Sequence, residues 1–308
     1  MRLGATLAAS FVAVLARPMA WPSALLAFLL RGGWLVIVAP IVVLPTAVGL
    51  GNVIAPWLED VAFGRRTGEL LTLAAVGGLI VLGWLVLGGL VAASAEIETI
   101  RAVSERPARP GRGTFALAAR VLAARLVGYL PLAIVGTIGV VRLVSVAYRE
   151  LTLPSQTTLP AVMRVLLGAP DAVIAIAVAW LLGETVGALA TRWIVVRHSS
   201  VRTALRQVLS DRRVLRRSFL LASITTLVLV IVVVATGAAT ASAWVALATE
   251  LALGSEPIAI GLLTVVFVAL FAGALVLIAV TEAWRCAVWT TDPDGTFGVP
   301  PGDRSGDW

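Results

Sequence analysis

The sequence predicts an all-α membrane protein: a polytopic bundle of six transmembrane helices, arranged as three tandem two-helix hairpins with interfacial amphipathic helices. Three observations carry this prediction: 59% hydrophobic against 13% charged residues, long apolar blocks, and a skewed distribution of arginine. The blocks are about 20 residues long, which is the helix length that a hydrocarbon core about 30 Å thick requires. Such a composition lies outside the range of soluble globular proteins.

Six apolar blocks are the candidate transmembrane helices. They cover residues 34–50, 70–95, 126–147, 172–190, 219–241 and 258–280. The first block contains Pro40 and Pro45, so it either bends or extends backward through residues 24–30 across Arg31-Gly32-Gly33. The fifth contains a β-branched run at 228–234, but its length favours a helix, since an open strand in lipid would leave its backbone unpaired.

The basic residues fall mainly on one side of this six-span order. All 24 of them are arginine; 19 lie in the termini and in the loops after the second and fourth spans, and 5 lie on the other side. Because basic residues concentrate in cytoplasmic loops, both termini are predicted to be cytoplasmic, in a bacterial inner membrane. The net charge of +7 is then explained by contact with anionic lipid head groups of the bilayer, not by nucleic-acid binding.

Residues 1–289 are predicted to form a single membrane domain. Residues 3–16 are either a signal peptide or a retained interfacial helix; the retained helix is favoured, because residues 17–22 lack a small-residue cleavage region. Residues 290–308 are rich in Asp, Pro and Gly and are predicted to be a disordered cytoplasmic tail.

A threefold internal repeat is predicted from the spacing of the spans. The odd-numbered spans begin at residues 34, 126 and 219, which are 92 and 93 residues apart. The even-numbered spans end at the arginines Arg101, Arg192 and Arg285. The simplest account is three tandem units, residues 1–104, 114–197 and 200–289, each an interfacial helix followed by a two-span hairpin.

Mitochondrial carriers also place six spans in three repeats, but their P-x-[DE]-x-x-[KR] signature is missing, since Pro131 is followed by Leu, Ala and Ile. The span count, the cytoplasmic termini and the arginine-bearing entry helices resemble bacterial six-helix proteins of the glycerophosphoryl diester phosphodiesterase membrane-domain type. This resemblance of layout covers most of residues 1–290. It implies a membrane bundle and no catalytic residue, because the phosphodiesterase domain found in some of those proteins is absent.

Glu184 is the strongest candidate for a functional site, because it lies inside the fourth span, about 10 Å from its cytoplasmic end. A charge at that depth faces protein or water and is typical of a proton, cation or amine site. Trp180 lies one turn away, and a small residue at every fourth position from Ala175 to Gly187 lets another helix approach closely. The alternative, which we favour, is a structural carboxylate neutralised by Arg120 or Arg125.

The remaining candidate sites are arginines. Arg142, near the outer end of the third span, either contacts an anion or extends its side chain to the interface. Residues 200–209 predict an amphipathic helix with Val201, Leu205, Val208 and Leu209 opposite its arginines. The predicted contacts with anionic lipid are Arg202, Arg206, Arg212, Arg213, Arg216 and Arg217. A cytoplasmic protein partner is the alternative.

No motif in the sequence indicates a reaction or a cofactor. Cys286 and His198 are the only residues of their kinds, and no phosphate-binding loop, nucleophile elbow or dinucleotide fingerprint occurs. We therefore expect no cofactor and favour a role other than catalysis: a transporter-like or membrane-organising component without its own ATPase. The alternatives are a structural or regulatory scaffold that binds a cytoplasmic partner through arginine-rich loops and, last, a lipid-modifying enzyme.

Overall fold

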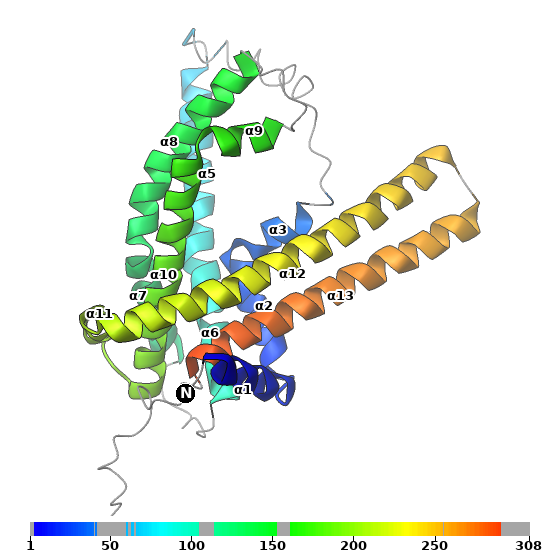
Figure 1. The fold of residues 1–308 in the computed structure, drawn as a ribbon. Coiled ribbons are helices and arrows are strands. Elements are labelled where there is room, and N and C mark those ends of the chain that lie inside the picture. Colours follow the sequence, from blue (N-terminus) through cyan, green and yellow to red (C-terminus); the bar gives the residue numbers. More distant parts are fainter. Residues whose placement is uncertain are drawn as a thin grey trace, which may run out of the picture. The chain divides into compact units, whose positions relative to one another are not determined.

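The computed structural model describes residues 3–39, 41, 60, 63–64, 66–104, 114–152, 161–254 and 256–290. These residues form helices, and no β-strand occurs among them (Figure 1). Six helices or helical runs are long and apolar enough to cross a membrane. The predicted all-α class and the six candidate spans are therefore confirmed. The tandem hairpins and the interfacial position of the amphipathic helices stay predictions.

The candidate spans follow the predicted order, but their ends differ from the apolar blocks. They are Ala20–Val38, Thr67–Val103, Leu130–Glu150, Pro170–Arg197, Arg212–Leu253 and Pro257–Thr290. The fifth and sixth contain 42 and 34 residues, far more than the about 20 that a bilayer core requires. Hydropathy marks only the apolar part of a helix, whereas the backbone here stays helical into the polar flanks.

The first span differs most from its predicted position. It begins at Ala20, not at residue 34, and consists of α2 (Ala20–Phe28), the π-helical η1 (Leu29–Gly33) and α3 (Trp34–Val38). Helix therefore continues backward across the Arg31-Gly32-Gly33 break, where Gly32 adopts a φ of +100° that side-chain-bearing residues rarely tolerate. Residues 42–50 of the predicted span lie outside the described residues.

The arginine-rich segment after the fourth span divides into two helices. Helix α10 (Pro170–Arg197) ends at His198, which has a left-handed φ of 53°, and α11 (Val201–Ser210) starts after Ser200, whose Oγ accepts a hydrogen bond from the Thr203 N–H at 3.2 Å. Asp211 then caps α12 (Arg212–Leu253), because its Oδ1 accepts the N–H groups of Arg213 and Val214 at 3.1 Å. Residues 212–217 thus belong to the long fifth helix.

The chain divides into two compact units. The first unit comprises Met1–Pro18, Ile97–Val228 and Trp284–Trp308, and the second comprises Met19–Glu96 and Leu229–Ala283. Helices α6 (Gly89–Val103), α12 and α13 (Pro257–Thr290) contribute residues to both units.

The first unit is organised around α10. Helix α10 packs against α7 (Thr114–Gly128), α8 (Leu130–Thr152) and α11, and α9 (Ala161–Gly168) joins α8 to α10 (Figure 1). Small residues line these contacts: a Cβ on Gly139 of α8 would lie 2.6 Å from the Ile176 side chain of α10. Helix α1 (Leu3–Leu15) also belongs to this unit.

The second unit contains the first two candidate spans and most of the last two. The second span is formed by α5 (Thr67–Gly83), the π-helical η2 (Trp84–Gly88) and α6, and the indoles of Trp34 and Trp84 meet edge to face at 6.3 Å. The later part of α12 and the earlier part of α13 run side by side (Figure 1), with the Trp244 and Phe267 rings 5.5 Å apart.

The pattern of exposure also fits a membrane environment. Large apolar side chains are exposed on the spans, for example Leu79, Ile138 and Leu262, at 68%, 68% and 65%. The buried residues are mostly alanine, threonine and other small side chains. In a soluble protein the large apolar residues would be buried, whereas helices that pack in lipid place small residues between them.

Candidate functional site

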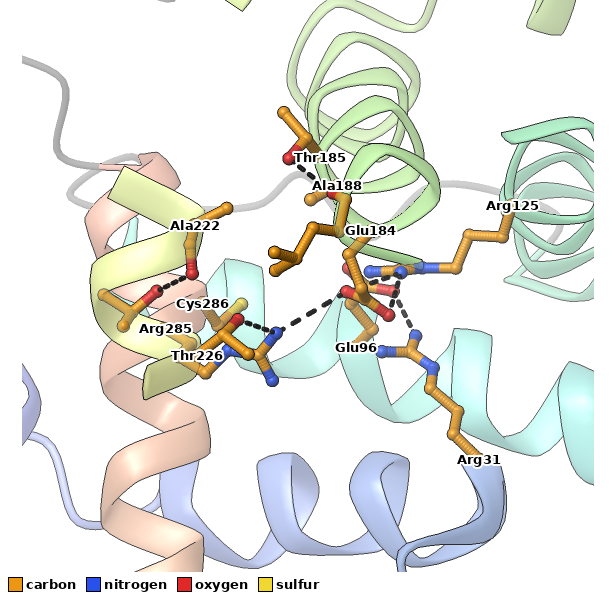
Figure 2. A network of polar contacts seen from close by, with 12 residues as sticks. Arg31, Glu96, Arg125, Glu184, Thr185, Ala188, Ala222, Thr226, Arg285 and Cys286 are labelled. Atoms are coloured by element: carbon orange, nitrogen blue, oxygen red, sulfur yellow. Dashed lines mark hydrogen bonds and ion pairs between the residues drawn. The ribbon is translucent and has the colours of Figure 1, made fainter. Parts of the chain in front are cut away.

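Glu184 lies on α10 in the first unit and is surrounded by donors from other segments. Nη1 of Arg125 (α7) lies 3.4 Å from each carboxylate oxygen, and Nη2 of Arg285 (α13) lies 3.8 Å from Oε2. The Tyr129 hydroxyl, at the junction of α7 and α8, donates a hydrogen bond to Oε1. Figure 2 shows the two arginines reaching Glu184 from opposite sides. We call these four residues the Glu184 cluster.

The cluster is largely shielded from solvent. The side chains of Arg125, Arg285 and Glu184 are 8%, 12% and 15% exposed. At such burial an ion pair is retained only when hydrogen bonds satisfy the charged groups, because each charge has lost its hydration. The phenol of Tyr129 supplies such a bond to the carboxylate, and Thr226 of α12 supplies one to Arg285, accepting at 3.2 Å from Nη2.

Local helix geometry explains why Arg125 and Tyr129 act together. They are four residues apart, and the Tyr129 N–H bonds to the Arg125 carbonyl at 2.9 Å, so both side chains lie on one helical face. Arg120, the other predicted partner, is five residues before Arg125, about 140° away around the helix, and it is exposed. The structure therefore brings Arg125 to Glu184 and leaves Arg120 on the outer face of α7.

Three glycines bring the two helices close enough for this contact. A Cβ on Gly128 of α7 would lie 3.2 Å from the Gly183 carbonyl oxygen and 3.3 Å from the Gly187 nitrogen of α10. A Cβ on Gly183 would meet the Tyr129 ring at 2.6 Å, and one on Gly187 would meet Arg125 Cγ at 3.3 Å. The glycines on both sides of Glu184 thus leave space for its two partners, as the small-residue ladder predicted.

The rest of the predicted ladder and Trp180 lie outside this close contact. Ala179 is buried and Ala175 is exposed. Trp180 is half-buried, one turn before Glu184. The Glu184 carboxylate contacts Arg125 of α7, Tyr129 at the junction of α7 and α8, and Arg285 of α13.

Arg192 is a second buried arginine that the sequence identified only as a marker of the repeat. Its side chain is almost fully buried, at 1% exposed for the residue. Its Nη1 donates to the Ala188 carbonyl at 3.0 Å, and its Nη2 donates to the Cys286 carbonyl at 2.9 Å and lies 3.1 Å from Cys286 Sγ. Arginine at the end of an even span was the only signal for this contact in the sequence.

A related ion pair, also missed by the sequence reading, occurs within the second unit. Arg31 Nη2 bonds to Glu96 Oε2 (Figure 2), and the Glu96 side chain is 5% exposed. Arg31 lies within the first span and Arg125 precedes the third, whereas Glu96 and Glu184 lie in the second and fourth spans. An arginine–glutamate pair thus occurs in each of the two units.

Helix α11, in the arginine-rich segment, has one face packed on protein and one face exposed. Ala204 and Val208 are buried, and α11 packs against α10 and α7. Arg202 and Arg206 are exposed together with Leu209, which is 58% exposed. Leu209 therefore lies on the arginine face, contrary to the predicted apolar face, because it is seven residues, about two helical turns, from Arg202. At the start of α12, Arg212, Arg213 and Arg216 are exposed and Arg217 is half-buried.

Two exposed pairs lie in segments predicted to face outward. Arg142 Nε is 3.8 Å from Asp171 Oδ2, with side chains 58% and 69% exposed, so the pair is weak. Arg66 Nε donates to Asp60 at 2.9 Å, and this hydrogen bond, with the nearby Glu69 carboxylate, raises the pKa of Arg66 above its ordinary value.

Helix α1 is held in the first unit by the end of α13. Trp284 Nε1 donates to the Leu7 carbonyl at 3.1 Å and to Ser10 Oγ at 3.0 Å, and Phe11 meets the indole edge to face at 5.7 Å. Ser10 is fully buried, while Phe11 and Val12 are 40% and 64% exposed. Thr6, Ser10 and Val14 of α1 therefore face protein, whereas Phe11 and Val12 point away from it.

The chemistry available at the Glu184 cluster is electrostatic and hydrogen-bonding. Among the described residues, no group of three or more His, Cys, Asp or Glu side chains could hold a metal ion.

Comparisons with protein-family models, curated proteins and solved structures found no match to the chain. The resemblance in layout to glycerophosphoryl diester phosphodiesterase membrane domains stays a prediction.

Proposed function

We propose that this chain is a multi-pass protein of the bacterial inner membrane that acts as a membrane-organising component without its own ATPase. In this proposal the Glu184 cluster ties helices together and is not a transport site. The observation that supports this proposal is that the Glu184 carboxylate already binds Tyr129, Arg125 and Arg285.

A transported proton or cation would have to compete with these donors. Binding at Glu184 would remove the negative charge that compensates the guanidinium groups of Arg125 and Arg285, both nearly buried. Breaking a buried ion pair by neutralising one partner costs about 3–5 kcal/mol. A transport site must bind and release its ion repeatedly, and this free-energy cost would oppose binding in every cycle. In a fixed contact between helices, the same cost keeps the ion pairs intact.

The proposal includes the tandem arrangement and the cytoplasmic orientation of both termini. The two pairs Arg31–Glu96 and Arg125–Glu184 support the repeat, because each joins an arginine to a glutamate of the next even-numbered span. The exposed arginines of α11 and α12 support the orientation, since positive charge concentrates on the cytoplasmic leaflet. Anionic lipid head groups are the partners that this surface fits.

The test combines stability with ion flux for the full chain in lipid. Glu184→Gln, Arg125→Gln and the double variant are compared with Glu98→Gln, which changes a carboxylate that is 60% exposed. We expect Glu184→Gln to lower the thermal midpoint in nanodiscs and the double variant to show a coupling of about 0.5–3 kcal/mol between the two sites. Glu98→Gln should leave the midpoint nearly unchanged.

The same proteins in vesicles, with an imposed proton or sodium gradient, test the transporter alternative. We expect the wild-type protein to collapse the gradient no faster than protein-free vesicles. A wild-type flux that disappears in Glu184→Gln while the thermal midpoint stays unchanged would overturn the proposal and assign Glu184 to transport.

A further inference from the structure

The first turns of α12 have one exposed face and one buried face. Leu220 and Leu227 are 47% and 60% exposed, whereas Leu221, Ala222 and Thr225 are buried. Exposed leucines on a helix long and apolar enough to cross a membrane mark the side that faces lipid. The lipid-facing stripe of this helix is thereby defined by Leu220 and Leu227.

Two arginines continue this stripe beyond its apolar part. With 3.6 residues per turn, Arg213, Arg216, Leu220 and Leu227 fall within an arc of about 60°, and both arginines are exposed. Arg217 lies about 40° outside this arc and is half-buried, with its Nη2 atom inaccessible to solvent. Exposure thus separates Arg213 and Arg216 from their neighbour.

Arg216 lies within the thickness of one head-group layer from Leu220, and Arg213 lies about 4 Å further out. At a rise of 1.5 Å per residue, Arg216 lies about 6 Å and Arg213 about 10 Å beyond Leu220 along the helix. The polar layer on each side of a bilayer is about 5–7 Å thick. Both side chains also lean toward the helix N-terminus, away from the hydrocarbon.

We propose that Arg213 and Arg216 form a binding site for the phosphate of an anionic lipid head group. Residues three apart are neighbours on a helix surface, and two guanidinium groups can each bind phosphate oxygens bidentately. Asp211 already accepts the N–H groups of Arg213 and Val214, so the arginine side chains, not the helix amides, supply the donors. The site rests on the proposed function and names the residues of its lipid contact.

Continuity with the apolar stripe favours lipid over an acidic segment of a cytoplasmic protein. A lipid places its phosphate at Arg213 and Arg216 and its acyl chains along Leu220 and Leu227, which are exposed on the same face. A cytoplasmic partner could contact the arginines but would not follow the stripe into the hydrocarbon. One ligand therefore accounts for both parts of the surface.

The experiment measures phosphatidylglycerol binding to the full chain by native mass spectrometry. Thermal midpoints are also measured in two kinds of nanodisc, one of phosphatidylcholine alone and one of phosphatidylcholine and phosphatidylglycerol in equal parts. Arg213→Gln/Arg216→Gln is compared with Arg202→Gln/Arg206→Gln, which removes the same charge from exposed positions of α11. We expect the first variant to lower phosphatidylglycerol affinity on the order of tenfold or more and the second to lower it much less. Equal midpoints in phosphatidylcholine alone would show that both variants fold.

Each other outcome has a distinct meaning. Equal losses in both variants would replace the site by diffuse charge attraction and overturn this inference. Binding that survives in Arg213→Gln/Arg216→Gln would also overturn it, while leaving the leaflet contact of the proposed function intact. A wild-type protein with no preference for phosphatidylglycerol would refute that leaflet contact as well.

Two soluble probes distinguish other sources of the anion. Neither inorganic phosphate nor polyglutamate is expected to displace the lipid or to raise the midpoint in phosphatidylcholine nanodiscs. Protection by inorganic phosphate that depends on Arg213 and Arg216 would instead indicate a soluble anion. Protection by polyglutamate would indicate an acidic protein partner.

Discussion

Arg192 Nη2 donates a hydrogen bond to the Cys286 carbonyl oxygen at 2.9 Å, which joins two residues 94 positions apart in the sequence. The guanidinium is 1% exposed and also binds the Ala188 carbonyl of its own helix. Arg192 therefore connects the end of α10 to the end of α13 by a hydrogen bond. In a bundle whose outer surface meets lipid, such polar contacts between helices add specificity that apolar packing alone does not supply.

The first prediction removes this contact. Arg192→Ala should lower the stability of the protein by about 2–4 kcal/mol, because two hydrogen bonds from a charged group and the packing of its aliphatic stem are lost together. The thermal midpoint in nanodiscs is the measurement. Arg197→Ala is the control: Arg197 is exposed and stacks on Trp193 at 4.6 Å, a contact worth about 0.5–1 kcal/mol at an exposed site. Equal effects of the two variants would contradict a structural role for Arg192.

The second prediction concerns the close approach at Gly183. Gly183→Ala should destabilise the protein by about 1–3 kcal/mol, since the added Cβ would lie 2.6 Å from the Tyr129 ring and force it to move. Gly77→Ala on α5 is the matched control, because nothing lies within 4 Å of its added Cβ. Alanine at Gly77 should be neutral or slightly stabilising, through its better helix propensity. Both are read as thermal midpoints.

The sequence predicted the helical class, the order of the spans and the general position of the Glu184 site. These features depend on runs of neighbouring apolar residues and on a charged residue within such a run, and both can be read directly from the sequence. It could not choose between Arg120 and Arg125, since both precede the same span and only the helical phase decides. Arg192 appeared in the sequence as a spacing marker, and its partner Cys286 depends on packing between distant helices. Leu209 was assigned to the wrong face, because its spacing of seven residues from Arg202, which places both on one side of the helix, was not taken into account.

The third prediction tests the hydroxyl of the Glu184 cluster. Tyr129→Phe keeps the ring against Gly183 and removes the hydroxyl that donates to Glu184. The loss should be about 1.5–3 kcal/mol in the wild-type background, because the acceptor is charged. In a Glu184→Gln background the same substitution should cost less. An identical cost in both backgrounds would show that the hydroxyl acts independently of Glu184.

The fourth prediction concerns the attachment of α1. Trp284→Phe should keep the edge contact with Phe11 and lose the two hydrogen bonds to Leu7 and Ser10. Ser10 is fully buried, so a cysteine placed there in a Cys286→Ala background should react slowly with a maleimide and faster once Trp284 is changed. A cysteine at the exposed Val12 should react at the same rate in both proteins. An unchanged rate at position 10 would mean that packing alone holds α1.

The last prediction tests whether the paired charges are equivalent elements of the repeat. Arg31→Glu and Glu96→Arg should each destabilise the protein strongly, since each places two like charges at a contact where one side chain is 5% exposed. The exchanged double variant should recover a substantial part of the loss, because the opposite charges are restored. At Arg125 and Glu184 the exchange should recover less, since Glu184→Arg would set a second guanidinium against Arg285 and deprive the Tyr129 hydroxyl of its carboxylate acceptor. Thermal midpoints of the six variants give the comparison. Full recovery at both sites would indicate two isolated pairs, and recovery at neither would indicate that local geometry, not charge, decides stability.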